Sequence, residues 1–201
     1  MANIITLSRF PLLFFYLALL YYGGPQAHLW AVFLILMVLF LDAVDGFVAR
    51  RRSETSLLGS VLDIATDRTM EYVLWVVFAH LGLISVIVPL IVLIRGTTVD
   101  AVRSVGMQEG KAAFDQLSTP LSHYLVSSRF MRALYGAAKT AAFALLTLQL
   151  ALPSGDDPLT SLVQISASAL TWTSVILCLL RGIPVLIEGY SLLRKEPAPT
   201  P

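Results

Sequence analysis

Six apolar stretches, each about as long as one crossing of a membrane, dominate this sequence. A hydrocarbon core about 30 Å thick takes roughly 20 apolar residues per helical crossing. Hydrophobic residues make up 57% and charged residues 13% of the 201 residues, a balance that ordinary soluble domains do not have. The sequence therefore predicts a polytopic membrane protein. The six spans are expected at residues 5–23, 29–50, 57–80, 84–105, 129–152 and 160–181.

The expected fold is all-α, with six transmembrane helices in a single bundle. Spans in lipid should be helical, because lipid offers no partner to an unpaired backbone group. Gly82 is expected to break a long apolar run, and without this break residues 72–94 would form one crossing and the number of spans would be odd. Residues 1–201 are expected to form one domain, with a polar cytoplasmic loop at 106–128 and a C-terminal tail at 182–201.

The basic residues near the span ends support this topology. Short cytoplasmic loops are enriched in Lys and Arg, and in the six-span arrangement all such residues fall on one side. Both termini are therefore expected in the cytoplasm, in a cell membrane of bacterial or archaeal type. The net charge of +1 gives no reason to expect a nucleic-acid partner. The residues that define the cytoplasmic side are Arg9, Arg50, Arg51, Arg52, Lys111, Arg129, Arg132, Arg194 and Lys195.

Four aspartates form the most informative polar cluster. Asp42 and Asp45 are three residues apart and Asp63 and Asp67 are four apart, so each pair projects from one face of its own helix. The Arg-rich segment between the pairs is short enough for a cytoplasmic turn, which makes the two helices antiparallel neighbours. The pairs should therefore face each other near the cytoplasmic membrane surface.

Carboxylates at this depth need positive charge nearby. Each intramembrane carboxylate costs about 2.5–3.5 kcal/mol on insertion scales, and converging carboxylates repel one another. Oxygen ligands in this number suit hard divalent ions such as Mg²⁺ or Mn²⁺. The single cysteine lies elsewhere and no histidine is near, which argues against zinc. We therefore expect Asp42, Asp45, Asp63 and Asp67 to be metal ligands.

Small residues and an arginine beside the aspartates suit phosphate chemistry. Two divalent ions can stabilise the attacking and leaving oxygens of a phosphoryl displacement. Gly46, Ala49 and Gly59 allow a nucleotide to approach the main chain, although small residues in membrane helices often serve packing alone. Arg50 can contact a phosphate, although its run of three arginines is also a topology signal.

The segment from Asp42 to Asp67 resembles the signature of the CDP-alcohol phosphatidyltransferases at every fixed position. It reads Asp, two residues, Asp-Gly, two residues, Ala-Arg, eight residues, Gly, three residues, Asp, three residues, Asp. Eight fixed positions make the motif specific. The signature covers 26 residues directly, and the six-span architecture fits the family along the whole chain.

The resemblance implies an enzyme of phospholipid biosynthesis that transfers a phosphatidyl group from CDP-diacylglycerol to a small alcohol and releases CMP. It also implies two metal ions, Mg²⁺ or Mn²⁺, and usually a homodimer surrounded by membrane lipid. By position, Asp42, Asp45 and Asp63 resemble metal ligands, and Asp67 resembles a metal-adjacent general base. The CDP-binding positions of the family correspond to Asp42, Gly46, Ala49, Arg50 and Gly59.

The acceptor alcohol is expected to be glycerol 3-phosphate. Asn3, Thr6 and Arg9 resemble the Asn, Thr, Arg pattern that opens phosphatidylglycerolphosphate synthases, which makes them further candidate site residues. Two departures, Gly96 where that subfamily usually has Glu and Ile64 where it usually has Pro, leave inositol phosphate or serine as alternative acceptors.

Basic residues further along the chain also resemble acceptor-side positions of that subfamily. They are Arg95, Arg103 and Lys139 with Thr140, and an acceptor phosphate needs such cationic partners. Arg95 and Lys139 lie inside apolar spans, where an idle charge is unfavourable. Glu71 is a further candidate, either as a supporting partner of the site or in a structural ion pair with an arginine such as Arg68 or Arg103.

A membrane transporter or cation channel is an alternative of a different class, because intramembrane carboxylates can also bind a permeating ion. A transport site belongs near the bilayer midplane, with broken helices in matching halves of the chain. The aspartates instead adjoin the Arg-rich cytoplasmic turn, and no internal repeat is visible. The sequence therefore favours the enzyme.

Overall fold

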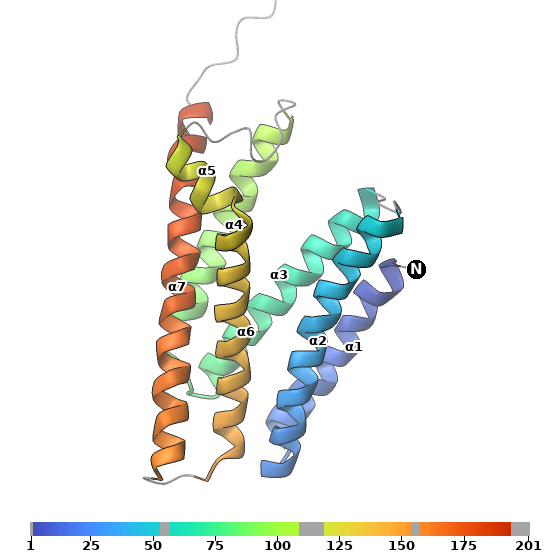
Figure 1. Cartoon of the computed structure of the whole chain (residues 1–201), viewed down its shortest axis with the longest axis vertical. Helices are drawn as coiled ribbons and strands as arrows, with labels where there is room; N and C mark the ends of the chain where they lie inside the picture. Colours follow the sequence, from blue (N-terminus) through green and yellow to red (C-terminus); the bar gives the residue numbers. More distant parts are fainter. Residues whose placement is uncertain (1, 53–56, 109–118, 154–156, 194–201) are drawn as a thin grey trace, which may run out of the picture. The chain divides into compact units, whose positions relative to one another are not determined.

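The computed structural model describes residues 2–52, 57–108, 119–153 and 157–193, and all regular structure within these ranges is helical. Their side chains are described except at residues 2–6, 41–52, 57, 58, 60, 105–108 and 190–193. The all-α expectation is confirmed for this part of the chain. Figure 1 shows the helices α1 (Ala2–Tyr22), α2 (Pro25–Arg52), α3 (Leu57–His80), α4 (Ile87–Gln108), α5 (Pro120–Ser127), α6 (Arg129–Ala151) and α7 (Pro158–Leu193).

Six long helices overlap the six expected spans, and α3 coincides with the expected 57–80. By length and composition, two described stretches can cross a membrane, Arg129–Ala151 and Pro158–Gly189. The parts of α1 and α2 whose side chains are described, Leu7–Tyr22 and Pro25–Phe40, are also apolar. The charged residues of α3 and α4 that belong to the expected site make these helices less apolar. Six membrane spans therefore remain a prediction.

The expected break at Gly82 is confirmed. α3 ends at His80, and Gly82 has a φ of 74°, in the left-handed region that favours glycine. The Gly82 N–H donates to the Ala79 carbonyl and the Leu83 N–H to the Phe78 carbonyl, each at 3.0 Å. This pair of bonds is the Schellman motif, which satisfies the last carbonyls of a helix. The turn separates α3 from α4.

Two expected non-helical segments are partly helical. α5 lies within the expected polar loop 106–128, and α7 continues to Leu193 through residues assigned to the tail, with Pro184 inside the helix. Gly182 and Pro184 resemble stop signals, but packing against α4 overrides them. A Cβ at Gly182 would collide with the Arg95 side chain, and one at Gly189 with Val102, so the glycines allow α4 and α7 to approach closely.

The helices form two compact units. The first comprises Met1–Val86 and Lys139–Thr171, and the second comprises Ile87–Ala138 and Trp172–Pro201. The single domain expected over residues 1–201 remains a prediction. Each unit has its own buried side chains, and each is described by itself.

In the first unit, α1 packs against α2 and α3. Trp75 of α3 meets Phe143 of α6 edge to face, with ring centroids 4.6 Å apart. The Tyr16 hydroxyl lies 2.6 Å from the Thr147 hydroxyl, which itself donates to the Phe143 carbonyl. Because a threonine hydroxyl has one proton to give, Tyr16 is the donor of the shared bond. These contacts attach α1 and α3 to the C-terminal half of α6.

In the second unit, Val99 of α4, Val126 of α5 and Val185 of α7 form a buried apolar cluster. α5 is attached to α7 by polar contacts as well, because the hydroxyls of Thr119 and Ser122 donate to the Glu188 carboxylate. This unit therefore consists of α4, α5 and the adjoining parts of α6 and α7.

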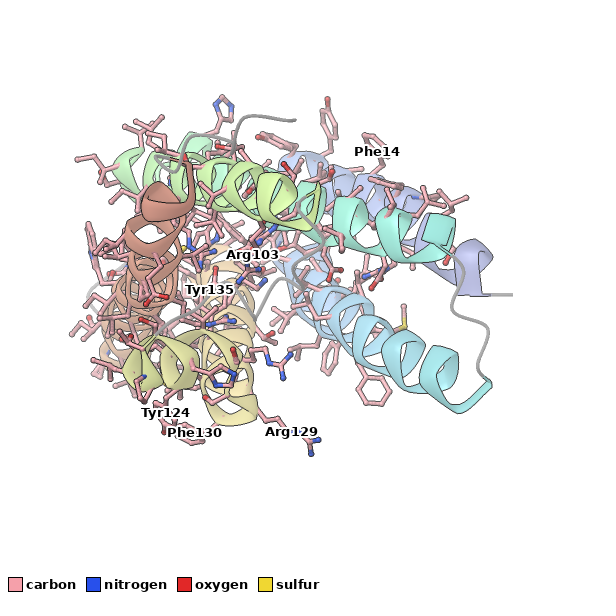
Figure 2. The ribbon with its side chains drawn as sticks, turned by 90° about the horizontal axis from the view of Figure 1, so that it is seen from above. Phe14, Arg103, Tyr124, Arg129, Phe130 and Tyr135 are labelled. Carbon is pink, nitrogen blue, oxygen red and sulfur yellow. The ribbon has the colours of Figure 1, made fainter. Side chains whose placement is uncertain are left out.

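Large apolar side chains are exposed on both units. Phe14 of the first unit is 68% exposed and points outward in Figure 2, and Ile187 of the second unit is 66% exposed. Soluble proteins rarely leave large contiguous apolar patches in water. These faces suit a lipid environment.

Candidate functional site

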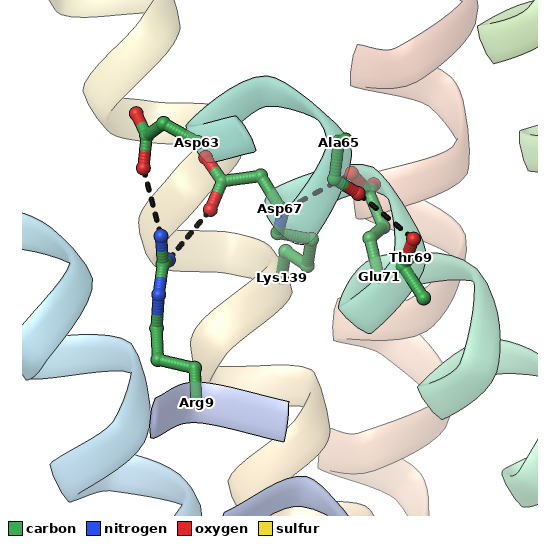
Figure 3. Close-up of polar contacts among 7 residues, drawn as sticks. All are labelled: Arg9, Asp63, Ala65, Asp67, Thr69, Glu71 and Lys139. Carbon is green, nitrogen blue, oxygen red and sulfur yellow. Dashed lines mark hydrogen bonds and ion pairs between the residues drawn. The ribbon is translucent and has the colours of Figure 1, made fainter. Parts of the chain in front are cut away.

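The two aspartates of α3 converge on one side chain of α1. The Arg9 guanidinium donates from Nη2 to Asp63 Oδ1 at 2.7 Å and from Nη1 to Asp67 Oδ1 at 2.8 Å (Figure 3). The four-residue spacing thus places both carboxylates on one face of α3, as the sequence predicts. Arg9 was a further candidate from the N-terminal pattern, and the structure places it in direct contact with two of the expected metal ligands.

The partners in this contact differ in solvent exposure. The Arg9 side chain is 1% exposed, whereas those of Asp63 and Asp67 are 46% and 47% exposed. A buried guanidinium forms charge-assisted hydrogen bonds to both carboxylates from within the unit. A cation or a substrate hydroxyl can therefore approach the same carboxylates from the exposed side.

A second ion pair lies one helical turn further along α3. Glu71, 5% exposed, lies 3.2 Å from the Lys139 ammonium of α6 and 3.7 Å from the Arg68 guanidinium. The expected pairing of Glu71 with Arg68 is therefore present, and Lys139 is an additional partner. Lys139 was expected on the acceptor side, and in the structure its ammonium contacts the Glu71 carboxylate (Figure 3).

A small cavity lies between these two groups of charges. Its volume is about 60 Å³, and its polar lining consists of Arg9, Asp67, Glu71 and Lys139. Liquid water occupies about 30 Å³ per molecule, so the cavity can hold one or two waters. It is too small for a nucleotide or a lipid headgroup. It can instead hold solvent beside the expected base.

Half of the expected metal ligands have side chains that the structure describes. Asp42 and Asp45 lie in α2, and their side chains fall outside those that the structure describes. Among the described side chains, no group of three or more His, Cys, Asp or Glu residues could hold a metal ion. The described half of the expected ligand set, Asp63 and Asp67, offers converging carboxylate oxygens, which fit Mg²⁺ or Mn²⁺ in chemistry. Two metal ions held by four aspartates remain a prediction.

The expected nucleotide positions are placed only by their backbone. Gly46, Ala49 and Arg50 lie in α2 with side chains outside those described, as do Asn3 and Thr6 in α1. Gly59 lies in the first turn of α3, four residues before Asp63. The roles of Gly46, Ala49, Arg50 and Gly59 in CDP binding remain predictions, as does the assignment of Asn3 and Thr6 to the site.

The second unit holds a cluster of arginines from three helices. Arg95 and Arg103 lie in α4, Arg132 in α6 and Arg181 in α7, and the charges of the first three act on that of Arg181. The Nε atoms of Arg95 and Arg181 are buried without a hydrogen-bond partner in the described part of the chain. Like charges held together repel one another, so this cluster favours an anion such as phosphate.

One cation–π contact and one hydrogen bond to the backbone hold Arg181 within this cluster. Its guanidinium carbon lies 5.4 Å from the centre of the Tyr135 ring, a cation–π distance, and its Nη2 donates to the Val126 carbonyl at 3.4 Å. Figure 2 shows Arg103 and Tyr135 pointing among the helices of this unit.

Sequence reasoning identified Arg95 and Arg103 and missed the other members of the cluster. Arg132 was interpreted as a topology signal and Arg181 as the end of a span. The apolar sequence on both sides of Arg181 could have identified it as a candidate site residue. An arginine between Leu180 and Val185 in one apolar run carries a free-energy cost that a functional role would explain. Thr140 lies half-buried in α6 beside Lys139, in the first unit.

Comparison with known proteins gives two matches. The sequence profile described as CDP-alcohol phosphatidyltransferase matches residues 1–180. A stretch of 69 residues is 36% identical to the cardiolipin synthase (CMP-forming) of Streptomyces coelicolor, covering 33% of this chain and 32% of that protein. The chain therefore matches about a third of the length of that relative.

Proposed function

Because the chain belongs to the CDP-alcohol phosphatidyltransferase family, we propose that it transfers a phosphatidyl group from CDP-diacylglycerol to a small alcohol and releases CMP. The observation that carries the proposal is the convergence of Asp63 and Asp67, the last two aspartates of the family signature, on Arg9 of α1. This geometry provides two exposed carboxylates on one helix face, beside a buried cation that holds them in place.

The donor side of the proposed site consists of α2 and α3. Asp42, Asp45, Asp63 and Asp67 would hold two Mg²⁺ or Mn²⁺ ions, which supply positive charge to the diphosphate and to the departing CMP. Gly46, Ala49, Arg50 and Gly59 would contact the CDP moiety, as the resemblance implies. Arg9 would keep Asp63 and Asp67 oriented from the buried side.

Asp67 is the proposed general base. The acceptor hydroxyl oxygen attacks the phosphorus that carries the lipid, the bond from this phosphorus to the CMP oxygen breaks, and the hydroxyl proton passes to a carboxylate oxygen of Asp67. The Asp67 side chain is 47% exposed, so a hydroxyl can reach it, and its bond to Arg9 fixes its direction. Positioning therefore contributes to the proton transfer.

The proposed acceptor is glycerol 3-phosphate. The cluster of Arg95, Arg103, Arg132 and Arg181 suits a phosphate group, and the first two were assigned to the acceptor from the sequence. Inositol phosphate would satisfy the same arginines. Serine carries no phosphate and gains less from them, so the cluster favours a phosphorylated alcohol.

A second candidate is the reaction that the matching relative is named for. Cardiolipin contains two phosphatidyl groups joined by glycerol, so a CMP-forming synthase that adds one of them uses phosphatidylglycerol as acceptor. The 36% identity to the Streptomyces coelicolor cardiolipin synthase over 69 residues favours testing this acceptor. Its phosphodiester would also suit an arginine cluster.

We also propose the membrane topology and the assembly. Six helices would cross a cell membrane with both termini and the aspartates on the cytoplasmic side, and two copies would form a homodimer. The two apolar stretches in α6 and α7 and the exposed apolar faces support the membrane location.

The test measures CMP release by the purified protein with CDP-diacylglycerol, Mg²⁺ or Mn²⁺, and a panel of acceptors. Glycerol 3-phosphate should give the fastest release, a chelator should abolish it, and either metal should restore it. Faster release with phosphatidylglycerol, inositol phosphate or serine would replace the acceptor assignment. No CMP release with any of these acceptors, together with metal-ion flux in vesicles, would favour the transporter.

The Asp67→Asn variant tests the base. Loss of general-base catalysis should lower turnover by at least about 100-fold, while thermal unfolding changes little. Asp157→Asn is the matched control, because Asp157 lies exposed at the start of α7, and turnover should stay normal. Near-normal turnover of Asp67→Asn would remove Asp67 from this role.

A further inference from the structure

Helix α5 lies at the ends of two candidate membrane spans. A single residue, Ser128, separates α5 from α6, and α6 is itself the candidate span Arg129–Ala151. Ser128 accepts a hydrogen bond at its hydroxyl from the Met131 N–H and donates its own N–H to the Tyr124 carbonyl, so it caps both helices. The joint between α5 and α6 is therefore short and well defined.

The inner side of α5 is attached to the last turns of the second candidate span, Pro158–Gly189 of α7. Ser122 hydrogen-bonds to Glu188, and Val126, one turn later, packs against Val185. Both α7 residues lie within five residues of the end of this span. Two independent attachments thus place α5 beside the first residue of one candidate span and the last turns of the other.

The outer side of α5 is apolar and exposed. Leu121 is 68% exposed and Tyr124 is 52% exposed, and Phe130 at the start of α6 is 63% exposed. Figure 2 shows Tyr124, Phe130 and Arg129 at the outer edge of this unit. His123 is also exposed, but it lies on the opposite flank of the helix from Leu121.

This distribution matches the chemistry of a membrane–water boundary. Aromatic residues are enriched there, and an arginine can extend to headgroup phosphates while its stem stays among apolar groups. Left in water, the same side chains would form an unfavourable exposed patch. We propose that α5 is an interfacial helix, with Leu121, Tyr124 and Phe130 inserted at the level of the lipid headgroups and Arg129 contacting their phosphates.

Fluorescent labelling at single cysteines tests this placement. Cys178, the single native cysteine, is replaced by alanine, and Leu121→Cys, Tyr124→Cys, His123→Cys and Ile176→Cys each carry a nitrobenzoxadiazole label. The proteins are reconstituted in vesicles of phosphatidylcholine and phosphatidylglycerol. Iodide quenches labels in water, and lipids with nitroxides at shallow or deep positions quench labels in the bilayer.

Labels at 121 and 124 should lose most iodide quenching relative to the label at 123 and should be quenched best by the shallow nitroxide. The label at 176, in the middle of α7 where the side chain is 55% exposed, should be quenched best by the deep nitroxide. Two positions on the apolar side keep the test informative if one variant fails to fold.

Equal iodide access at 121, 124 and 123, with 176 protected, would overturn the interfacial placement alone. Iodide access at 176 would overturn the α7 span and the placement of α5 with it. Neither result depends on CMP release, so the inference and the proposed activity fail separately.

Discussion

The Arg9 bridge is the contact whose loss has the most predictable consequence. Arg9→Gln removes the two charge-assisted hydrogen bonds to Asp63 and Asp67, at 2.7 and 2.8 Å. Hydrogen bonds to charged groups contribute about 1.5–3 kcal/mol each. Because both carboxylates are nearly half exposed, water replaces part of this interaction. We expect the free energy of unfolding to fall by about 2–3 kcal/mol.

Thermal unfolding in detergent micelles measures this loss. For a chain of this size a change of about 1 kcal/mol shifts the midpoint by roughly 2–4 °C, so the expected shift is about 4–12 °C. With Trp30 and Trp172 replaced by phenylalanine, the fluorescence of Trp75, which is 1% exposed in the same unit as Arg9, reports the first unit. Reaction of the buried Cys178 with a thiol dye reports the second unit.

The control and the metal dependence complete this test. Arg68→Gln removes a longer contact with Glu71, at 3.7 Å, and leaves that carboxylate paired with Lys139, so it should cost less than about 1 kcal/mol. Mg²⁺ should stabilise Arg9→Gln more than the parent protein, because a divalent cation replaces the lost positive charge at Asp63 and Asp67. An unchanged midpoint for Arg9→Gln would refute the stabilising role of the bridge, and equal Mg²⁺ effects would show that Arg9 and the metal do not share these carboxylates.

Two glycine substitutions give further predictions. Gly82→Ala forces a side chain into the left-handed region and should lower the free energy of unfolding by about 1–2 kcal/mol. The control Gly24→Ala, which has open space and no positive φ, should be nearly neutral. Equal thermal unfolding midpoints of the two variants would contradict the role of the turn. Gly182→Ala should displace the Arg95 side chain and raise the KM for glycerol 3-phosphate more than it lowers kcat. The control Gly136→Ala has open space around it and should leave the KM unchanged. An unchanged KM for Gly182→Ala would show that Arg95 does not bind the acceptor.

Local properties of the chain account for what the sequence predicted correctly. Six apolar stretches of helical length became six long helices, and the glycine expected to interrupt one run became the turn after α3. The shared face of Asp63 and Asp67 follows from a four-residue spacing, which any α-helix converts into neighbouring side chains. None of these inferences needed knowledge of distant contacts.

The remaining features depend on contacts between residues far apart in the sequence. Arg9 lies 58 residues from Asp67, and no local period indicates that a buried guanidinium from α1 bridges the α3 carboxylates. The arginine cluster likewise requires α4, α6 and α7 to come together, and the continuation of α7 past Pro184 requires its glycines to pack against α4. The sequence by itself therefore determined the helices and the face on which the aspartates lie, because hydrophobic period and residue spacing act locally. Tertiary structure alone decided which cations meet those aspartates and that α7 continues past Pro184, because side-chain packing and ion pairing act across the chain.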